Sequence, residues 1–371
     1  MRIEKIELPF STSGTSRSLQ VMRFGRADAR PKIYVQASLH ADEIPGMLTA
    51  VRLCNRLAAL EAEGKILGEI VVVPVANPIG LAQSIQGSAF GRFALADGTN
   101  FNRHFAELSL PAAERLRGRL THDAAENREL IREALRASVQ ALRATDEISA
   151  LRRELLRLAI DADVVLDLHC DSEAVTHLYT STAHALRAAP LAAALGAKAL
   201  LTAEVSGDHP FDEAVSRTWL ELARIFSDYP IAHSCFATTV ELRGDVDVSY
   251  ALADHDTAAI LYFATLEGAI SMALPPAEPD AVFATPLAGV LPLSAPVAGI
   301  VVFECAVGDW IRRGEIVARL VDPISLDETA LTSDIDGVLF ARTRTRYAIA
   351  GQRLAKIAGR DPIRSGKLLS P

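Results

Sequence analysis

Two residues early in the chain, His40 and Glu43, have the types and the spacing of metal ligands. They follow an apolar run that ends near Leu39, and a separation of three residues puts both side chains on one turn of chain. Zinc binds imidazole nitrogen and carboxylate oxygen, and a catalytic zinc site needs only three protein ligands plus water. Because His-x-x-Glu pairs are common by chance, this pair alone is weak support for a metal site.

A second histidine, His169, closes an apolar run in the sequence Asp167-Leu168-His169. A charged residue and a histidine on a buried strand need a compensating partner or a metal ion, because an unpaired polar group is costly to bury. The alternative is a hydrogen-bonded core histidine, the commoner role of an isolated one. The neighbouring Cys170 would point to the opposite face of the strand, so we expect it to pack in the core.

A third motif, Asn100-x-Asn102-Arg103, follows Arg92 and could bind an anion. The planar guanidinium group of arginine binds a carboxylate through two parallel hydrogen bonds, and a neighbouring amide can complete the recognition. The alternative is a turn that two asparagines hold together, with an arginine exposed to solvent.

The fourth motif places Glu241 at the end of another apolar run. Burial there would raise the pKa of its carboxyl group, which suits a general base that works near neutral pH. The alternative is an ion pair with Arg243, because residues two apart on a strand share a face.

These motifs lie at the ends of short apolar runs that predict strands of an α/β fold. The runs are apolar on both faces, as strands in a sheet covered on both sides must be. Helical periodicity between them predicts a mixed, largely parallel sheet flanked by helices, with ligands at the strand ends. The expected strands are residues 32–37, 70–76, 164–168 and 237–241, and the expected helices are residues 47–60 and 252–270.

Residues 107–160 differ from the rest, since they are rich in Ala, Arg, Glu and Leu and almost free of glycine and β-branched residues. Apolar residues recur there at spacings of three and four, which predicts a pair of amphipathic helices. We interpret this segment as an insertion between sheet elements, with its charged residues in solvent.

The chain after residue 274 predicts a separate small domain. Several prolines between 275 and 286 mark a boundary, so we expect a catalytic domain over residues 1–273 and a β-rich domain over residues 288–360. Two similar units follow, one beginning at Gly299 and the other at Gly337. Such a repeat predicts a small all-β barrel-sandwich.

The composition excludes several classes of protein. The 371 residues carry a net charge of −8, which argues against a nucleic-acid partner. The four scattered cysteines predict neither disulfides nor a cysteine zinc cluster. No stretch has the roughly 20 apolar residues of a membrane span, and the start lacks a signal peptide. We therefore expect a soluble, cytoplasmic protein without a membrane partner.

Taken in order, the four motifs resemble those of the zinc carboxypeptidase superfamily, and within it the succinylglutamate desuccinylase/aspartoacylase family. The resemblance covers about residues 30–273. It implies that His40, Glu43 and His169 hold one Zn²⁺ ion per chain, which would polarise an acyl carbonyl and acidify a bound water. Glu241 would then be the general base and acid, and Arg92 would stabilise the oxyanion of the tetrahedral intermediate.

The resemblance also implies that Asn102 and Arg103 bind the carboxylate of the substrate. Family members often have Asp where this chain has Asn100, at the position that accepts a hydrogen bond from a zinc-binding histidine. An amide oxygen can still orient His40 but raises its basicity less than a carboxylate. We therefore predict that zinc is retained with somewhat weaker affinity.

The implied activity is a zinc-dependent deacylase that hydrolyses the amide bond of a small N-acyl amino acid or related carboxylate. A metallocarboxypeptidase acting on short peptides is the alternative, and a non-catalytic binding protein is the weakest option because the proposed ligands and base are all present. The acyl group and the amine stay open. Four further residues could line the pocket, namely Arg217, Arg243, His177 and His209.

The repeated C-terminal unit resembles the barrel-sandwich of biotinyl and lipoyl carriers, which attach their cofactor to a lysine at a hairpin tip. The corresponding stretch here, residues 332–337, has no lysine. We therefore expect no swinging-arm cofactor, and a module that shapes the active-site entrance or mediates assembly into a homo-oligomer.

Overall fold

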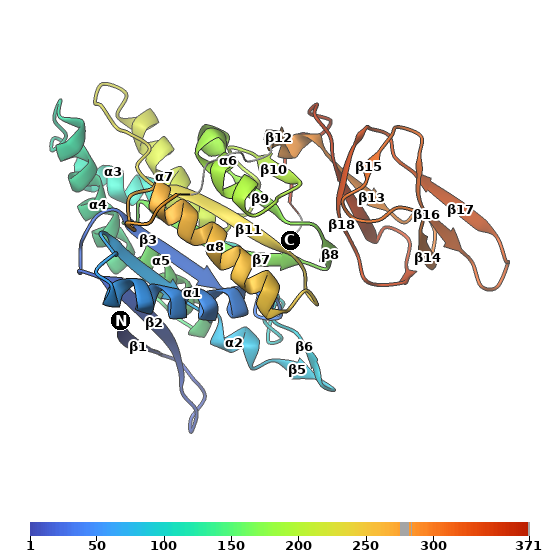
Figure 1. Ribbon diagram of the computed structural model, residues 1–371, viewed down its shortest axis with the longest axis horizontal. Coiled ribbons are helices and arrows are strands. Elements are labelled where there is room, and N and C mark those ends of the chain that lie inside the picture. The colour runs from blue at the N-terminus through green and yellow to red at the C-terminus, as the bar shows by residue number, and fades with distance from the viewer. Residues whose placement is uncertain (275–281, 283, 370–371) are drawn as a thin grey trace.

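A nine-stranded sheet forms the centre of the protein in the computed structural model, which describes residues 1–274, 282 and 284–369 (Figure 1). The strands that meet at its middle run parallel, whereas an antiparallel hairpin forms one edge and β9 is antiparallel to β11. The predicted mixed, largely parallel sheet is confirmed. In spatial order the strands are β1 (Arg2–Leu8), β2 (Arg17–Gly25), β4 (Glu69–Val73), β3 (Lys32–Ala37), β7 (Val164–Asp171), β11 (Phe236–Gly244), β9 (His177–Thr180), β10 (Ala199–Thr202) and β12 (Ala284–Pro286).

Helices cover both faces of this sheet, because its central strands carry apolar side chains in both directions. On β3, for example, Ile33 and Val35 face one hydrophobic core and Tyr34 faces the other. The helices on the first face are α1 (Pro45–Ala62), α6 (Ala185–Ala194) and α8 (Tyr250–Leu266). Those on the second are α3 (Ser109–Leu116), α4 (Ala124–Gln140), α5 (Glu147–Ala159) and α7 (Phe211–Ile225).

The segment 107–160 contains the two expected amphipathic helices, α4 and α5, and also the short helix α3. Asp123 caps α4 by accepting hydrogen bonds from two backbone N–H groups, and Asp146 forms a capping box at the start of α5. The apolar stripes of α4 and α5 are buried against the sheet. The sequence did not predict α3, since its eight residues are too few for a clear helical period.

Two small antiparallel sheets form the end of the chain (Figure 1). The two units of the repeat supply corresponding strand pairs, β14 with β16 and β18 with β20. The predicted small all-β unit is confirmed. The strands are β13 (Val290–Ser294), β20 (Arg353–Ala358), β18 (Gly337–Arg342) and β15 (Trp310–Ile311) in one sheet, and β17 (Glu328–Thr332), β16 (Ile316–Val321), β14 (Gly299–Phe303) and β19 (Tyr347–Ala348) in the other.

The two parts of the molecule are joined by strand pairing and by shared apolar packing. The short strand β8 (Glu173–Ala174), which follows β7, pairs with β18 of the C-terminal sheet. Most of the prolines that mark the predicted boundary lie in residues 275–281, outside the described residues, whereas Pro286 ends β12 at the edge of the central sheet. The division into domains at this point stays a prediction.

None of the helices within the described residues is both long enough and apolar enough to cross a membrane.

Candidate functional site

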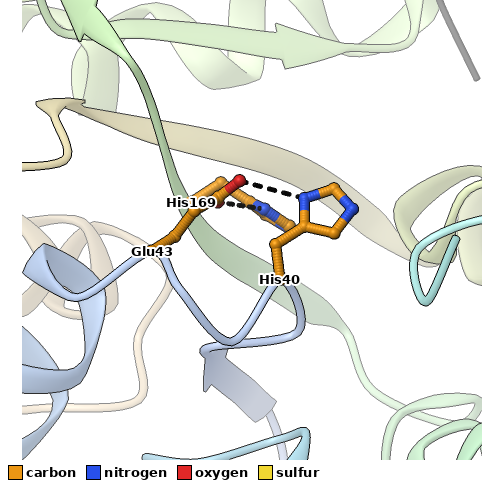
Figure 2. Close-up of side chains that lie close together, drawn as sticks. All are labelled: His40, Glu43 and His169. Carbon is orange, nitrogen blue, oxygen red and sulfur yellow. Dashed lines mark hydrogen bonds and ion pairs between the residues drawn. The ribbon is translucent and has the colours of Figure 1, made fainter. Parts of the chain in front are cut away.

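His40, Glu43 and His169 come together at the carboxyl ends of two adjacent parallel strands. His40 and Glu43 lie on the turn between β3 and α1, and His169 lies near the end of β7, which pairs with β3. Glu43 lies between the two imidazole rings, with Oε1 3.0 Å from Nδ1 of His40 and Oε2 2.7 Å from Nδ1 of His169 (Figure 2). All three side chains are buried, and their potential ligand atoms lie within 4.8 Å of one another. This arrangement could hold a metal ion.

The other ring nitrogens turn away from this centre toward oxygen atoms. Nε2 of His40 lies 2.9 Å from Oδ1 of Asn100, and Nε2 of His169 lies 3.0 Å from Oδ2 of Asp167. A proton on each Nε2 would leave each Nδ1 with a lone pair directed at the centre. In metal sites, an oxygen atom beside the non-coordinating ring nitrogen orients the histidine in this way. Burial, with a contribution from Arg92, lowers the pKa of His40 to about 4, so its ring is neutral near pH 7.

Asp167 contacts the site, although the sequence motif predicted no role for it. Its Oδ1 accepts a hydrogen bond from Nε2 of Gln36 at 2.9 Å, and Oε1 of Gln36 accepts one from the hydroxyl of Tyr34 at 2.9 Å. Burial opposes protonation of His169, but the carboxylates of Asp167 and Glu43 raise its pKa above the usual value. The spacing of Asp167 and His169 was the signal for this contact, because residues two apart on a strand share a face.

Glu241 lies beside the metal-ligand candidates on the next strand, where β11 pairs it in register with His169. Burial, together with the charge of Glu43, raises the pKa of Glu241 to about 8, and a cation at the centre would act in the opposite direction. Its Oε2 has no hydrogen-bond partner among the described residues. Arg243 pairs instead with Asp256, at 2.9 and 2.6 Å, so the alternative of a Glu241–Arg243 ion pair is not found.

Arg92 reaches the same centre from the loop that follows a short helix and hairpin, α2 (Pro78–Leu81), β5 (Ser84–Ile85) and β6 (Ser88–Ala89). Its Nη1 lies 3.1 Å from Nδ1 of His40 and 3.3 Å from Oε1 of Glu43. The preceding Gly91 allows this approach, since a Cβ there would lie 2.2 Å from the backbone nitrogen of Asp42. The guanidinium group is partly exposed toward the cavity described below.

Asn102 and Arg103 lie near the histidines, on the stretch that follows Asn100. Oδ1 of Asn102 accepts a hydrogen bond from the backbone N–H of Phe211 at 2.9 Å, and its Nδ2 lies 3.3 Å from Nε2 of His169. Arg103 is 5% exposed, and its Nη1 donates to the carbonyl of Asn102 at 2.7 Å. The Asn102 amide oxygen is thus already engaged within the protein, and both Asn102 and Arg103 line the cavity.

A cavity of about 1100 Å³ brings these residues together with the C-terminal strands. Asp212, at the start of α7, also lines it, and burial raises the pKa of this carboxyl group to about 7. Asp212 is not among the residues predicted from the sequence, because an acidic residue in the first turn of a helix is ordinary. The C-terminal strands contribute Phe340, Arg342 and Lys356 to the wall.

The four further candidates for the pocket lie in different places. Arg217 lines the cavity, and His209 lines a smaller pocket beside it. His177 is buried and lies 2.8 Å through Nδ1 from the carbonyl of Val175, and Arg243 is engaged by Asp256.

Comparison with known proteins places the chain in a family. Residues 29–261 match the family model described as the succinylglutamate desuccinylase/aspartoacylase catalytic domain. The chain belongs to this family. The matched range contains His40, Glu43, Arg92, Arg103, His169 and Glu241, among the other candidate residues. The family consists of deacylases that act on small acylated amino acids and are typically metal-dependent.

Solved structures of the succinylglutamate desuccinylase/aspartoacylase type share the fold over nearly the whole chain. A family protein from Shewanella amazonensis has a TM-score of 0.84 at 24% identity, covering 96% of this chain and 98% of its own. One from Shewanella frigidimarina has a TM-score of 0.84 at 22% identity, covering 96% and 97%. A product-bound ectoine utilization protein from Ruegeria pomeroyi has a TM-score of 0.67 at 15% identity, covering 95% and 93%. No curated protein matched the chain.

Proposed function

We propose that this protein is a zinc-dependent deacylase that hydrolyses the amide bond of a small N-acyl amino acid or a related carboxylate. The observation that carries the proposal is the convergence of two buried Nδ1 atoms and the Glu43 carboxylate beside a second, partnerless carboxylate oxygen on Glu241. A hydrolase of this type needs a metal site and a nearby general base, and both open into one cavity.

The side chains at this centre fit a zinc ion. Two imidazoles and one carboxylate match the ligand set of catalytic zinc sites, and each histidine has an oxygen atom within 3.0 Å of its far nitrogen. Bound there, zinc would polarise the acyl carbonyl and lower the pKa of a coordinated water.

Glu241 is proposed as the proton carrier of the reaction. Its carboxylate would take the proton of the attacking water and then deliver it to the amine nitrogen when the amide bond breaks. Burial favours the protonated form of Glu241, which makes it an effective acid in the second step.

Two arginines would bind the negative charges of the substrate. Arg92, which lies against His40 and Glu43, would stabilise the oxyanion that forms on the carbonyl oxygen. Arg103, together with the neighbouring Asn102, would bind the substrate carboxylate, since the guanidinium fork can donate two parallel hydrogen bonds to it.

The position of the C-terminal strands favours small substrates over peptides. Phe340, Arg342 and Lys356 close one side of the cavity that contains the metal-ligand candidates. A carboxypeptidase acting on longer chains would need an open groove in this place. The structure of the cavity therefore favours the deacylase over the carboxypeptidase alternative.

A panel of N-acyl amino acids and short peptides, assayed with zinc-loaded and with chelated protein, tests the proposal. We expect hydrolysis of N-acyl amino acids by the zinc-loaded protein alone. Glu241→Gln should lower kcat by about 10²- to 10⁴-fold with zinc content unchanged, whereas the exposed Glu63→Gln serves as the matched control. Preferred cleavage of peptides would favour the carboxypeptidase, and activity insensitive to chelation would refute the metal mechanism.

A further inference from the structure

After β20 the chain turns back and runs along the wall of the cavity. Residues 361–369, here called the return segment, are fastened to the loop between β10 and α7. The backbone N–H groups of Leu368 and Leu369 both donate to the carbonyl of Ser206, at 3.0 and 3.2 Å. Arg364 donates from Nη1 to the carbonyl of Leu368 and from Nη2 to that of Leu287, each at 3.2 Å. The segment is therefore anchored to the central sheet's loops and not only to the C-terminal strands.

A close approach at Gly207 brings the return segment against this loop. Gly207 has φ +118°, and a Cβ there would lie 2.9 Å from Cγ of Lys367. Lys367 also forms an ion pair with the neighbouring Asp208. A larger residue at position 207 would be strained by its own backbone and would push the segment away.

The return segment lies on the side of the cavity where Arg103 is found. The hydrogen bond from Lys367 lowers the pKa of Asp208, and the nearby charge of Arg103 acts in the same direction. The backbone carbonyl of Asp208 accepts a hydrogen bond from the N–H of His104, the residue after Arg103, at 2.7 Å. The return segment and the stretch that follows Arg103 thus both contact Asp208, one through its side chain and the other through its backbone.

The two leucines of the segment form part of the apolar lining. Leu368 and Leu369 both line the cavity, and both pack against a hydrophobic cluster built from the central sheet and the C-terminal strands. This cluster includes Leu201, Leu287 and Phe340, which also line the cavity. The leucine side chains therefore form part of the wall of the cavity that Arg103 also lines.

We infer that Leu368 and Leu369 form the wall that limits the size of the substrate's amino-acid side chain, an inference that rests on the proposed deacylase function. If Arg103 holds the carboxylate of an N-acyl amino acid, the side chain on the same carbon must lie within a few ångströms of that carboxylate. The wall on that side is the return segment. The substrate class is accordingly N-acyl derivatives of amino acids with small side chains.

The test compares kcat/KM for N-acetyl amino acids whose side chains grow from alanine through leucine to phenylalanine. In the Leu368→Ala/Leu369→Ala variant we expect the ratio of phenylalanine to alanine substrate to rise about tenfold, since a few methylene groups in a pocket discriminate by about 10- to 200-fold. Leu369→Trp should shift the ratio in the opposite direction. Leu186→Ala, at a residue 91% exposed on α6, is the matched control.

Two outcomes would overturn this inference. An unchanged ratio in both wall variants would show that the leucines do not limit the side chain. An equal rise for every substrate would show instead that the segment competes with substrate as a lid.

A binding measurement separates this inference from the proposed function. Calorimetric titration with propanoate and 3-phenylpropanoate needs no catalysis, and we expect the double alanine variant to gain affinity for the larger acid relative to the smaller. A different outcome is that the wild-type protein hydrolyses no N-acyl amino acid while the affinities shift in this way. That result would refute the deacylase proposal and support the inference that the two leucines limit the size of the side chain. If the relative affinities did not shift, the size-limiting role of the two leucines would be refuted, whether or not the protein hydrolysed N-acyl amino acids.

Discussion

At the scale of single residues, the two histidines of the site differ in what holds their far nitrogens. The amide of Asn100 faces Nε2 of His40, and the carboxylate of Asp167 faces Nε2 of His169. The pKa shifts follow this difference, because burial lowers the pKa of His40, whereas the carboxylates of Asp167 and Glu43 overcome burial and raise that of His169. His40 is thus a ready neutral ligand, and His169 must lose a proton when a metal binds.

Replacing Asn100 with aspartate should strengthen zinc binding. Nδ2 of Asn100 donates to no acceptor among the described residues, so a carboxylate oxygen in its place removes no hydrogen bond. Added negative charge beside Nε2 makes the imidazole a stronger ligand, and changes in such partners typically alter metal affinity by about 10- to 100-fold. We expect at least a severalfold lower dissociation constant in a competition titration with a chromophoric chelator. Unchanged affinity, relative to an exposed Asn55→Asp control, would contradict the role assigned to Asn100.

At the scale of elements, adjacent parallel strands create the site by ending at one edge of the sheet. β3, β7 and β11 are neighbours, and each delivers a chemically active residue at or just beyond its carboxyl end. The helical segment 107–160 also contributes, because Nη2 of Arg152 on α5 donates to the backbone carbonyl of Asn100 at 2.7 Å. A segment whose charged residues we expected to lie in solvent therefore supports the loop that orients His40.

A stacked histidine pair between elements predicts sensitivity to acid. His184, at the end of the short 3₁₀ helix η1 (Thr182–His184), stacks on His233 with ring centroids 3.9 Å apart, and neither of its ring nitrogens has a hydrogen-bond partner among the described residues. Burial, with the charges of His233 and Arg187, lowers the pKa of His184 to about 3. Between about pH 6.5 and 3 the unfolded chain therefore binds a proton that the folded protein excludes.

The free energy of unfolding should thus fall as the pH drops through this window. His184→Phe removes that contribution, so below pH 6 the slope of stability against pH should be smaller by up to about 1.4 kcal/mol per pH unit. Urea unfolding of metal-free protein between pH 4 and 7 measures the slope, with the exposed His255→Phe as the matched control. Equal slopes in wild type and His184→Phe would show that His184 does not contribute.

At the scale of the whole molecule, the cavity lies where two parts of the chain share a hydrophobic core. Leu201 and Ala174 from the central sheet region pack against Phe340 and Val290 of the C-terminal strands. Ion pairs add to the contact, since Lys356 pairs with Asp171 and Glu173 pairs with two arginines of the C-terminal part. The C-terminal strands are therefore part of the site's architecture.

Phe340→Ala should weaken this shared core. Phe340 is fully buried, and its ring centroid lies 4.8 Å from that of His177. A cavity in place of a buried phenylalanine costs about 3–5 kcal/mol, so we expect a loss of this order in urea unfolding, together with reduced kcat/KM. The exposed Phe10→Ala is the control. Reduced activity without any loss of stability would show that Phe340 contacts substrate but does not hold the parts together.

The sequence alone determined the fold class and most of the chemical groups. Apolar runs located the central strands because a strand covered on both faces must be apolar in both directions. The polar residues that close those runs identified His40, Glu43, His169 and Glu241 as candidates. These are local properties of the chain, so a single sequence contains them.

Only the tertiary structure decided which groups face one another. The pairing of Asn100 with His40, which the family resemblance implied, the burial of Asp212 and the return of residues 361–369 to the cavity join parts of the chain that are far apart. Spacing along the chain does not encode such contacts, because strand register and the packing of the C-terminal strands on the central sheet determine them.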